Sequence, residues 1–233
     1  MKLGMMQPYF YPYLGYWQLM NYVDEYIIYD DVNFIKGGWI HRNRIKINCE
    51  AQYFGIKIKK PSQNRKICDH EMSMSEKDRM DLLKKVQNAY VHAPYYKDVA
   101  ELFEKTVMYD AVGVGEFLEY SNRAIADYLG IKTKIYTASG LKLNHEHRGQ
   151  QRILDICKER GCDAYINAIG GTNIYSKDEF AAEGIRLNFL RMNPDIVYEQ
   201  GKGDFLPGLS ILDVMMYNSK DELSELLNRY TLE

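Results

Sequence analysis

Two hydrophobic periods alternate along most of the chain. Short apolar runs, typical of buried strands, are separated by stretches in which apolar residues recur every three or four positions, as in helices. The strand-like runs are residues 3–6, 26–29, 131–138, 163–168 and 185–192. The helical patterns are residues 16–23, 149–160, 177–182, 211–217 and 220–230. This alternation predicts an α/β fold with a Rossmann-like, mostly parallel sheet.

The middle of the chain departs from this rhythm. Residues 44–48 and 53–59 alternate apolar and polar positions, which predicts a β-hairpin arm with its turn at 49–52, and residues 66–72 resemble a further short strand. Three amphipathic helices without an intervening strand are then predicted at 75–91, 98–108 and 115–129, the first with a capping box from Ser75 and Asp78. We expect one α/β domain over residues 1–233 with a helical insertion at about 75–130.

Composition and charge argue against several classes of protein. The formal net charge of −2 argues against a general electrostatic binder of nucleic acid. No run of 18 apolar residues is present, so no transmembrane segment is expected. The four cysteines show no CxxC spacing and no secretory leader is apparent, which predicts reduced thiols and a cytoplasmic location. The sequence gives no signal for a cofactor.

The loop after the first strand is dense in tyrosine and proline, and we expect it to bind a ligand at the start of a helix. The alternative is a rigid turn that only packs the helix on the sheet. Its candidate binding residues are Gln7, Tyr9, Tyr13, Gly15 and Tyr16. The layout is similar to that of nucleotidylyltransferases, whose HxGH loop grips phosphates, but Tyr13 and Tyr16 stand where the two histidines would be.

An acidic pair and a basic segment follow the second strand. Asp30 and Asp31 are candidate proton acceptors, and because neighbouring residues point to opposite faces, only one of them should enter a given pocket. The segment that follows offers phosphate donors, a stacking ring and a further proton carrier, His41. Its candidate binding residues are Lys36, Trp39, Arg42, Asn43 and Arg44. The alternatives are a solvated strand-end turn and a basic loop that pairs with the aspartates.

Later motifs are weaker. Gly170, Gly171 and Tyr175 follow a strand and precede a helix that Ser176 is expected to cap, which suits close approach of a phosphate or sugar. Ser210 is expected to cap a late helix, with Asp213 in its first turn. Two further readings have little support, namely a metal site at His145 and His147 and a thiol–base pair of Cys68 and His70, so no metal is expected.

Four segments in order resemble the WbqC-like family. They read MQPYFYPYLGYWQL, VDEYIIYDDVNFIKGGWIHRNRI, GGTNIYSKDEF with GIRLNF, and FLPGLSILDVMM. The family is known mainly from bacterial gene clusters for O-antigen and other surface polysaccharides, and a transferase role, such as moving an aminoacyl group onto a sugar, has been suggested for it. The resemblance implies importance for most of the candidates above and for Ser210 and Asp213.

These observations predict a transferase of surface-polysaccharide biosynthesis that moves an acyl or aminoacyl group onto an activated amino sugar. The partner would be a small-molecule substrate, a nucleotide-activated or lipid-linked sugar. Two alternatives remain open at this point: a nucleotidylyltransferase-like enzyme with a modified HxGH loop, and a non-catalytic protein that binds a nucleotide-sugar.

Overall fold

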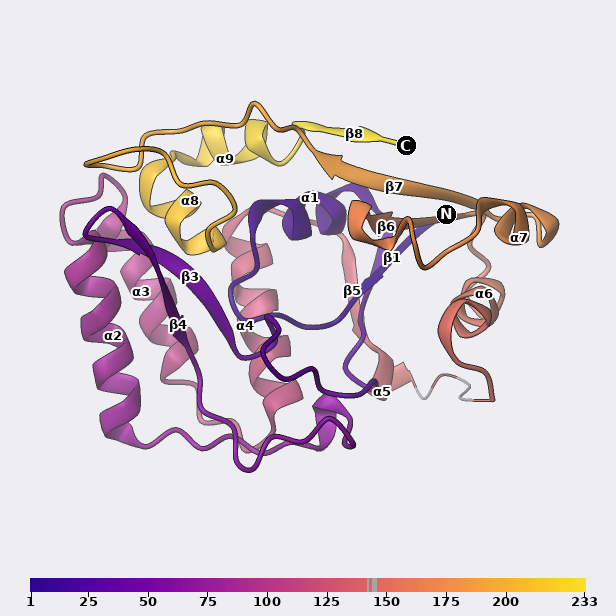
Figure 1. Ribbon diagram of the computed structural model, residues 1–233, viewed down its shortest axis with the longest axis horizontal. Coiled ribbons are helices and arrows are strands. Elements are labelled where there is room, and N and C mark those ends of the chain that lie inside the picture. The colour runs from indigo at the N-terminus through magenta and orange to yellow at the C-terminus, as the bar shows by residue number, and fades with distance from the viewer. Residues whose placement is uncertain (142, 144–145) are drawn as a thin grey trace.

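A mixed sheet forms the centre of the molecule in the computed structural model, which describes residues 1–141, 143 and 146–233. Within these residues, six strands pair in the order β5-β2-β1-β6-β7-β8 (Figure 1). Their bounds are β1 Lys2–Met6, β2 Glu25–Ile28, β5 Lys134–Thr137, β6 Ala164–Ala168, β7 Arg186–Met192 and β8 Tyr230–Leu232. Every pairing is parallel except that of β8 with β7. The predicted Rossmann-like, mostly parallel sheet is confirmed.

The order of strands reverses beside β1. Gly4 of β1 lies opposite Tyr26 of β2 on one side and Ile166 of β6 on the other. The chain first builds outward through β2 and β5, and then returns to add β6 and β7 on the opposite side. In open α/β sheets, ligands bind beyond the carboxyl ends of the strands where the order reverses. The loops after β1 and β6 therefore emerge side by side at the position where a ligand site is expected.

Helices cover both faces of the sheet (Figure 1). Tyr26, Ile28 and Ile166 point into one hydrophobic core, and Leu3 and Tyr165, of opposite strand parity, point into another. The first core is shared with α1 Leu14–Tyr22, α2 Glu76–Tyr90, α3 Tyr96–Val107, α4 Val114–Tyr128, α8 Ile211–Tyr217 and α9 Lys220–Leu226. The second is shared with α5 Ala138–Leu141, α6 Gly149–Glu159 and α7 Lys177–Ala182. The result is a three-layer α/β arrangement.

The hairpin arm is confirmed, but its predicted turn was wrong. Strands β3 (Arg42–Ile47) and β4 (Glu50–Gly55) are joined by Asn48 and Cys49 alone, with φ of 52° and 64°. A two-residue turn with positive φ at both positions matches the twist of the two strands, and asparagine tolerates that conformation well. The second strand consequently starts and ends earlier than its alternating pattern indicated.

Two further predictions were wrong. Residues 66–72 contain a short 3₁₀ helix, η1 Ile67–Asp69, because the backbone N–H groups of Ile67 and Cys68 donate to carbonyls of the segment after β2 rather than to a strand ladder. The last helix ends at Leu226, and the chain then forms the edge strand β8. The predicted capping box of α2 is confirmed, since Ser75 and Asp78 bond reciprocally. No helix among the described residues has both the length and the apolar character needed to cross a membrane.

Candidate functional site

The loop after β1 is held rigidly from two sides. Tyr11 has a positive φ of 46° and is fully buried, so its conformation depends on the groups around it. The side-chain amide of Asn43 donates to the carbonyls of Phe10 and Tyr11 at 3.2 and 2.8 Å, and the Ser210 hydroxyl donates to the Tyr11 carbonyl at 2.8 Å. Asn43, a candidate binding residue, therefore positions this loop.

Tyr13, Gly15 and Tyr16 do not form an exposed phosphate grip. A Cβ on Gly15 would lie 2.5 Å from the Tyr13 ring, so glycine is required here to seat that ring. Tyr16 is fully buried, and its hydroxyl donates to the Gln7 carbonyl at 3.3 Å and accepts from Asn122 at 3.4 Å. Burial raises the pKa of Tyr16. The tyrosine in the second histidine position of the HxGH pattern thus faces the protein interior.

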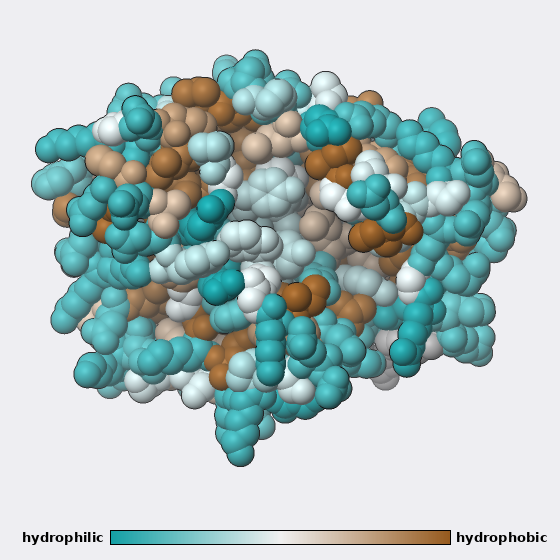
Figure 2. Space-filling view, viewed as in Figure 1, coloured by the Kyte–Doolittle hydropathy of each residue, from teal (hydrophilic) through white to brown (hydrophobic). Residues whose placement is uncertain are grey.

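Other residues of this region form what we term the aromatic pocket, a hollow of about 120 Å³. It is lined by Tyr9, Pro12, Tyr13, Trp39, Asn43 and Gly208. Trp39 remains 39% exposed, and the Arg44 guanidinium lies 5.6 Å from the centre of its ring. Tyr13 and Tyr9 are half-buried, and burial raises the pKa of both. Near-neutral residues, drawn pale, cover much of the middle of the face shown in Figure 2, and hydrophilic residues, drawn teal, surround them.

The two arginines of the basic segment lie on the hairpin arm. The Arg42 guanidinium stacks 4.4 Å from the centre of the Tyr53 ring and donates to the carbonyls of Gly37 and Gly38. Lys36 is exposed on the loop that precedes this arm. Neither Arg42 nor Arg44 lines the cavity described below, and their predicted role as phosphate donors stays a prediction.

Asp30 and Asp31 point in different directions, as their adjacency predicts. The Asp30 carboxylate accepts from the backbone N–H of Ser139 at 2.9 Å and from its hydroxyl, at the start of α5. Burial raises the pKa of Asp30, although the bonds from Ser139 oppose the rise. Asp31 instead forms a buried ion pair with Arg152 of α6, with 2.6 Å between Nη2 and Oδ2. Asp30 is thus engaged at the β5–α5 junction, and Asp31 belongs to a separate cavity.

That second hollow, which we term the cationic cavity, has a volume of about 340 Å³ and lies between the end of β2, the η1 region and the start of α6. It is lined by Tyr29, Asp31, Val32, Asn33, Lys66, His147, Arg148, Gly149 and Arg152. Arg152 donates to the Tyr29 hydroxyl at 3.0 Å, and among the described residues its Nε has no hydrogen-bond partner although the side chain is only 6% exposed. A buried guanidinium N–H without a partner is a position where a ligand oxygen is favoured.

The N-terminus of α6 adds to this positive potential. Arg148 is the N-cap residue but makes no side-chain capping bond, so the first N–H groups of the helix are not capped by that side chain. Backbone N–H groups at a helix start favour anions. Lys66, Arg148 and Arg152 surround this helix end, and Asp31 neutralises only one of their charges. The arrangement fits a phosphate or another anion.

These cations were not among the candidates predicted from the sequence. Arg148 and Arg152 are four residues apart at the start of a helix, where the helix dipole disfavours positive charge. Two arginines in the first turn of a helix in an α/β fold indicate that an anion compensates their charge. Lys66 comes from a distant segment and carries no such signal.

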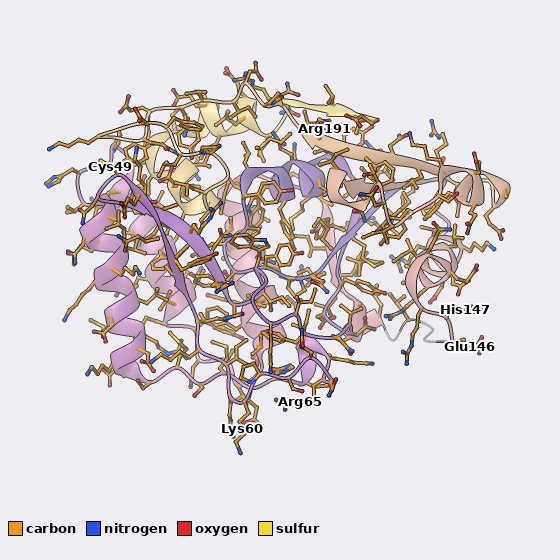
Figure 3. All side chains as sticks on the ribbon, in the orientation of Figure 1. Cys49, Lys60, Arg65, Glu146, His147 and Arg191 are labelled. Atoms are coloured by element: carbon orange, nitrogen blue, oxygen red, sulfur yellow. The ribbon has the colours of Figure 1, made fainter. Side chains whose placement is uncertain are left out.

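A histidine–aspartate pair also borders the cationic cavity. The Nδ1 of His147 lies 2.6 Å from Oδ2 of Asp155, and this contact lowers the pKa of Asp155. Figure 3 shows His147 next to the start of α6. A carboxylate that fixes one ring nitrogen orients the other for proton transfer. His147 is therefore a candidate proton acceptor, whereas the sequence pattern suggested it only as a metal ligand.

The two histidine hypotheses from the sequence have different outcomes. His41 packs 5.6 Å from the Phe34 ring, its pKa is lowered by burial and then by Arg42, and it lines neither pocket. His145 lies outside the described residues. Within the described part of the chain, no group of three metal-ligating side chains occurs.

The loop after β6 packs closely. A Cβ on Gly171 would lie 2.7 Å from the Asn167 side chain and 3.2 Å from the Tyr175 ring, so glycine permits this contact. Tyr175 in turn packs against Tyr165, with ring centres 5.8 Å apart. Gly170 is exposed and a Cβ there would meet nothing within 4 Å. The predicted binding roles of these three residues stay predictions.

Cys68 is expected to be a poor nucleophile. Burial and the nearby Asp30 raise the pKa of its thiol to about 11, and both ring nitrogens of His70 are already bonded, to Ser62 N–H and to the Lys66 carbonyl. At pH 8 we expect iodoacetamide to label exposed Cys49 at least tenfold faster than Cys68, as followed by peptide mass spectrometry. Equal labelling rates would contradict this assignment.

Comparison with known proteins agrees with the sequence motifs. The model of the WbqC-like protein family matches residues 7–225, which is nearly the whole chain. The chain is also 26% identical over 222 residues to the uncharacterized protein Rv1507c of Mycobacterium tuberculosis, with 92% of each chain covered. No solved structure matches it. The chain belongs to the WbqC-like protein family.

Proposed function

We propose that this protein is a transferase of bacterial surface-polysaccharide biosynthesis that moves an acyl or aminoacyl group onto an activated amino sugar. The observation that carries the proposal is the cationic cavity at the carboxyl edge of the sheet, with the aromatic pocket on the same edge. One segment, residues 29–43, supplies Tyr29 and Asp31 to the cavity and Trp39 and Asn43 to the pocket. A substrate with a phosphate at one end and a sugar ring beside it suits this pair.

The cationic cavity would bind the phosphate of the activated sugar. Arg152 is pre-organised by Asp31 and Tyr29, so it loses little side-chain freedom when an anion binds. Its unpartnered Nε and the N-terminus of α6 supply donors, while Lys66 and Arg148 supply charge. Charge-assisted bonds of this kind are the stronger class of hydrogen bond.

The aromatic pocket would bind the sugar ring. Sugars present apolar C–H faces that stack on aromatic rings and hydroxyls that bond at the rim. Trp39 offers an exposed face, and Tyr9 and Tyr13 offer hydroxyls that are protonated at neutral pH, since burial raises their pKa further above its ordinary value. These residues are uncharged, so they fit the neutral part of the substrate.

Transfer to an amine requires a proton acceptor. The amino nitrogen of the sugar attacks the carbonyl carbon of the donor, a C–N bond forms, the bond to the donor's leaving group breaks, and the amine proton must go to a base. His147, oriented by Asp155 on the wall of the cationic cavity, is the best candidate in the structure. Asp30 and Asp31 are both engaged in bonds to other residues. The burial of Tyr16 disfavours the nucleotidyl-transfer alternative, because an HxGH-type loop requires both end residues to reach phosphate.

The phosphate site can be tested with glucosamine 1-phosphate and glucosamine as probes. We expect the phosphorylated sugar to bind the wild-type protein, and the Arg148→Ala variant to bind it about tenfold more weakly because one charge-assisted contact is lost. Isothermal titration calorimetry at two salt concentrations measures both effects, since screening should weaken binding. Arg191→Ala is the matched control, because Arg191 pairs with Glu233 on the sheet edge.

Two outcomes would count against the proposal. Equal affinity for glucosamine and its 1-phosphate would show that the protein has no phosphate site. Equal losses of affinity in Arg148→Ala and Arg191→Ala would show that only the net charge of the protein matters. Turnover is then sought by mass spectrometry with acyl and aminoacyl donors. Binding without any acyl transfer would favour the alternative of a non-catalytic protein that binds a nucleotide-sugar.

A further inference from the structure

A third hollow lies beyond the carboxyl end of β7. It has a volume of about 250 Å³ and is bounded by the end of β7, the loop 193–210, the start of α1 and α8. Its walls are largely apolar and include Leu14, Ile196, Phe205 and Val214. Among the described residues, no charged side chain lines it. We term it the apolar pocket.

The apolar pocket continues from the aromatic pocket. Tyr13 and Gly208 line both hollows, so the Tyr13 ring stands at the boundary between them. This ring is held in place because it packs over Gly15, where any larger residue would collide with it. A ligand bound in the aromatic pocket therefore has a direct neighbour into which a substituent can extend.

The three hollows follow the order of the strands. The cationic cavity lies at the end of β2, the aromatic pocket is built from the loop after β1, and the apolar pocket lies at the end of β7. The strand order β2-β1-β6-β7 makes three steps of about 4.8 Å, so the ends of β2 and β7, beside the two outer hollows, lie roughly 14 Å apart along the sheet edge. A linear substrate would meet phosphate, sugar and apolar sites in that sequence.

We infer that the apolar pocket takes the acyl group that is joined to the amino sugar, and that this group is an uncharged aliphatic chain. The inference rests on the proposed function and narrows it. A glycyl or other aminoacyl group carries an ammonium ion, which would lose its hydration in this pocket without a carboxylate to pair with. An aliphatic chain instead gains free energy with every methylene group buried.

The side chains available for polar contact support an uncharged occupant. The Tyr198 hydroxyl already bonds with Asp213 at 2.8 Å and with Gln200 at 3.0 Å. Asn193 also lines the pocket, and its amide suits the carbonyl of an acyl linkage. The pocket therefore combines a few uncharged polar groups with apolar walls, which is the pattern that an N-acyl group requires.

The test uses 4-amino-4-deoxyglucose 1-phosphate, whose amine lies across the sugar ring from the phosphate, with N-acetyl, N-butanoyl, N-hexanoyl or N-glycyl groups as probes. Calorimetry with the wild-type protein should show affinity rising about fourfold for each added methylene until the pocket is full, and the N-glycyl probe should bind more weakly than the N-acetyl probe. The Ile196→Phe variant should abolish the rise because the added ring fills the pocket. Ile35→Phe is the control, since Ile35 is 47% exposed and outside the three hollows.

The outcomes separate this inference from the proposed function. If all probes bind with equal affinity and Arg148→Ala weakens them equally, the phosphate site stands and the acyl site is overturned. A chain-length dependence that persists in Ile196→Phe overturns it as well. If none of the probes binds, both the proposed function and the acyl site fail. A thermal melt of each variant confirms that it is folded before binding is measured.

Discussion

Replacing Arg152 with alanine is expected to lower the free energy of unfolding by about 3–5 kcal/mol. The reason is the carboxylate of Asp31, which is 2% exposed and forms an ion pair with Arg152. Without the guanidinium, this buried carboxylate loses its ion pair with Arg152. Urea unfolding followed by circular dichroism measures the change, and the same variant should lose binding of glucosamine 1-phosphate.

Two variants test the cause of the loss. Arg160→Ala removes a more exposed pair at the other end of the same helix, with Glu25, and should cost about 1 kcal/mol. The double variant Asp31→Asn with Arg152→Ala removes the buried charge as well, so it should be more stable than Arg152→Ala alone. If the double variant is no more stable than Arg152→Ala, the lost ion pair does not cause the destabilisation. The loss would then come from the packing contacts of the arginine side chain.

The elements of the fold were largely predictable because their signals are local. The apolar run at residues 163–168 and the capping residues Ser75 and Ser176 act within a few positions, and the structure confirms each of them. The turn at Asn48 and Cys49 was misplaced because alternation continues across it and marks no boundary. The edge strand β8 escaped prediction because its three residues depend on pairing with β7 for their conformation.

The candidate site was only partly predictable because it depends on long-range contacts. Tyr9, Tyr13 and Trp39 were identified from composition, and the structure brings them together in the aromatic pocket. Arg152, which forms an ion pair with Asp31, lies 121 residues further along the chain, and no spacing rule connects the two. Lys66 and Arg148 likewise meet only when η1 and α6 approach the end of β2. The sequence therefore indicated the aromatic pocket and Asp31, and gave no indication of the cations around Asp31.

Asp213 was predicted to be a first-turn acid of α8, and in the structure it is also the centre of a buried hydrogen-bond network. The cap at Ser210 is confirmed, with Leu212 N–H donating to its hydroxyl at 3.1 Å. The Asp213 carboxylate is fully buried and accepts three bonds, from Tyr90 at 2.7 Å, Tyr198 at 2.8 Å and Gln200 at 2.9 Å. It thereby ties α2 and the loop 193–210 to α8.

Replacing Asp213 with alanine should consequently destabilise the protein by about 3–5 kcal/mol, since three buried donors lose their acceptor. Hydrogen exchange should also quicken in the loop 193–210, because Gln200 bonds to Leu206 within it. Asp221→Ala, an exposed first-turn acid of α9, is the control and should cost under about 1 kcal/mol. If both alanine variants melt alike and exchange in the loop is unchanged, the network does not stabilise the wall of the apolar pocket.

The Asp213→Asn variant separates the charge of the carboxylate from its hydrogen bonds. Burial raises the pKa of Asp213, although its three partners oppose the rise. A raised folded-state pKa means that the stabilising contribution is complete below the unfolded pKa and declines as pH rises through the folded value. Asparagine does not titrate, so the stability deficit of Asp213→Asn relative to wild type should shrink between pH 4 and pH 7. A deficit that grows over this range would show that the ionised carboxylate is the favoured form in the folded protein, and that its three donors outweigh the cost of burying the charge.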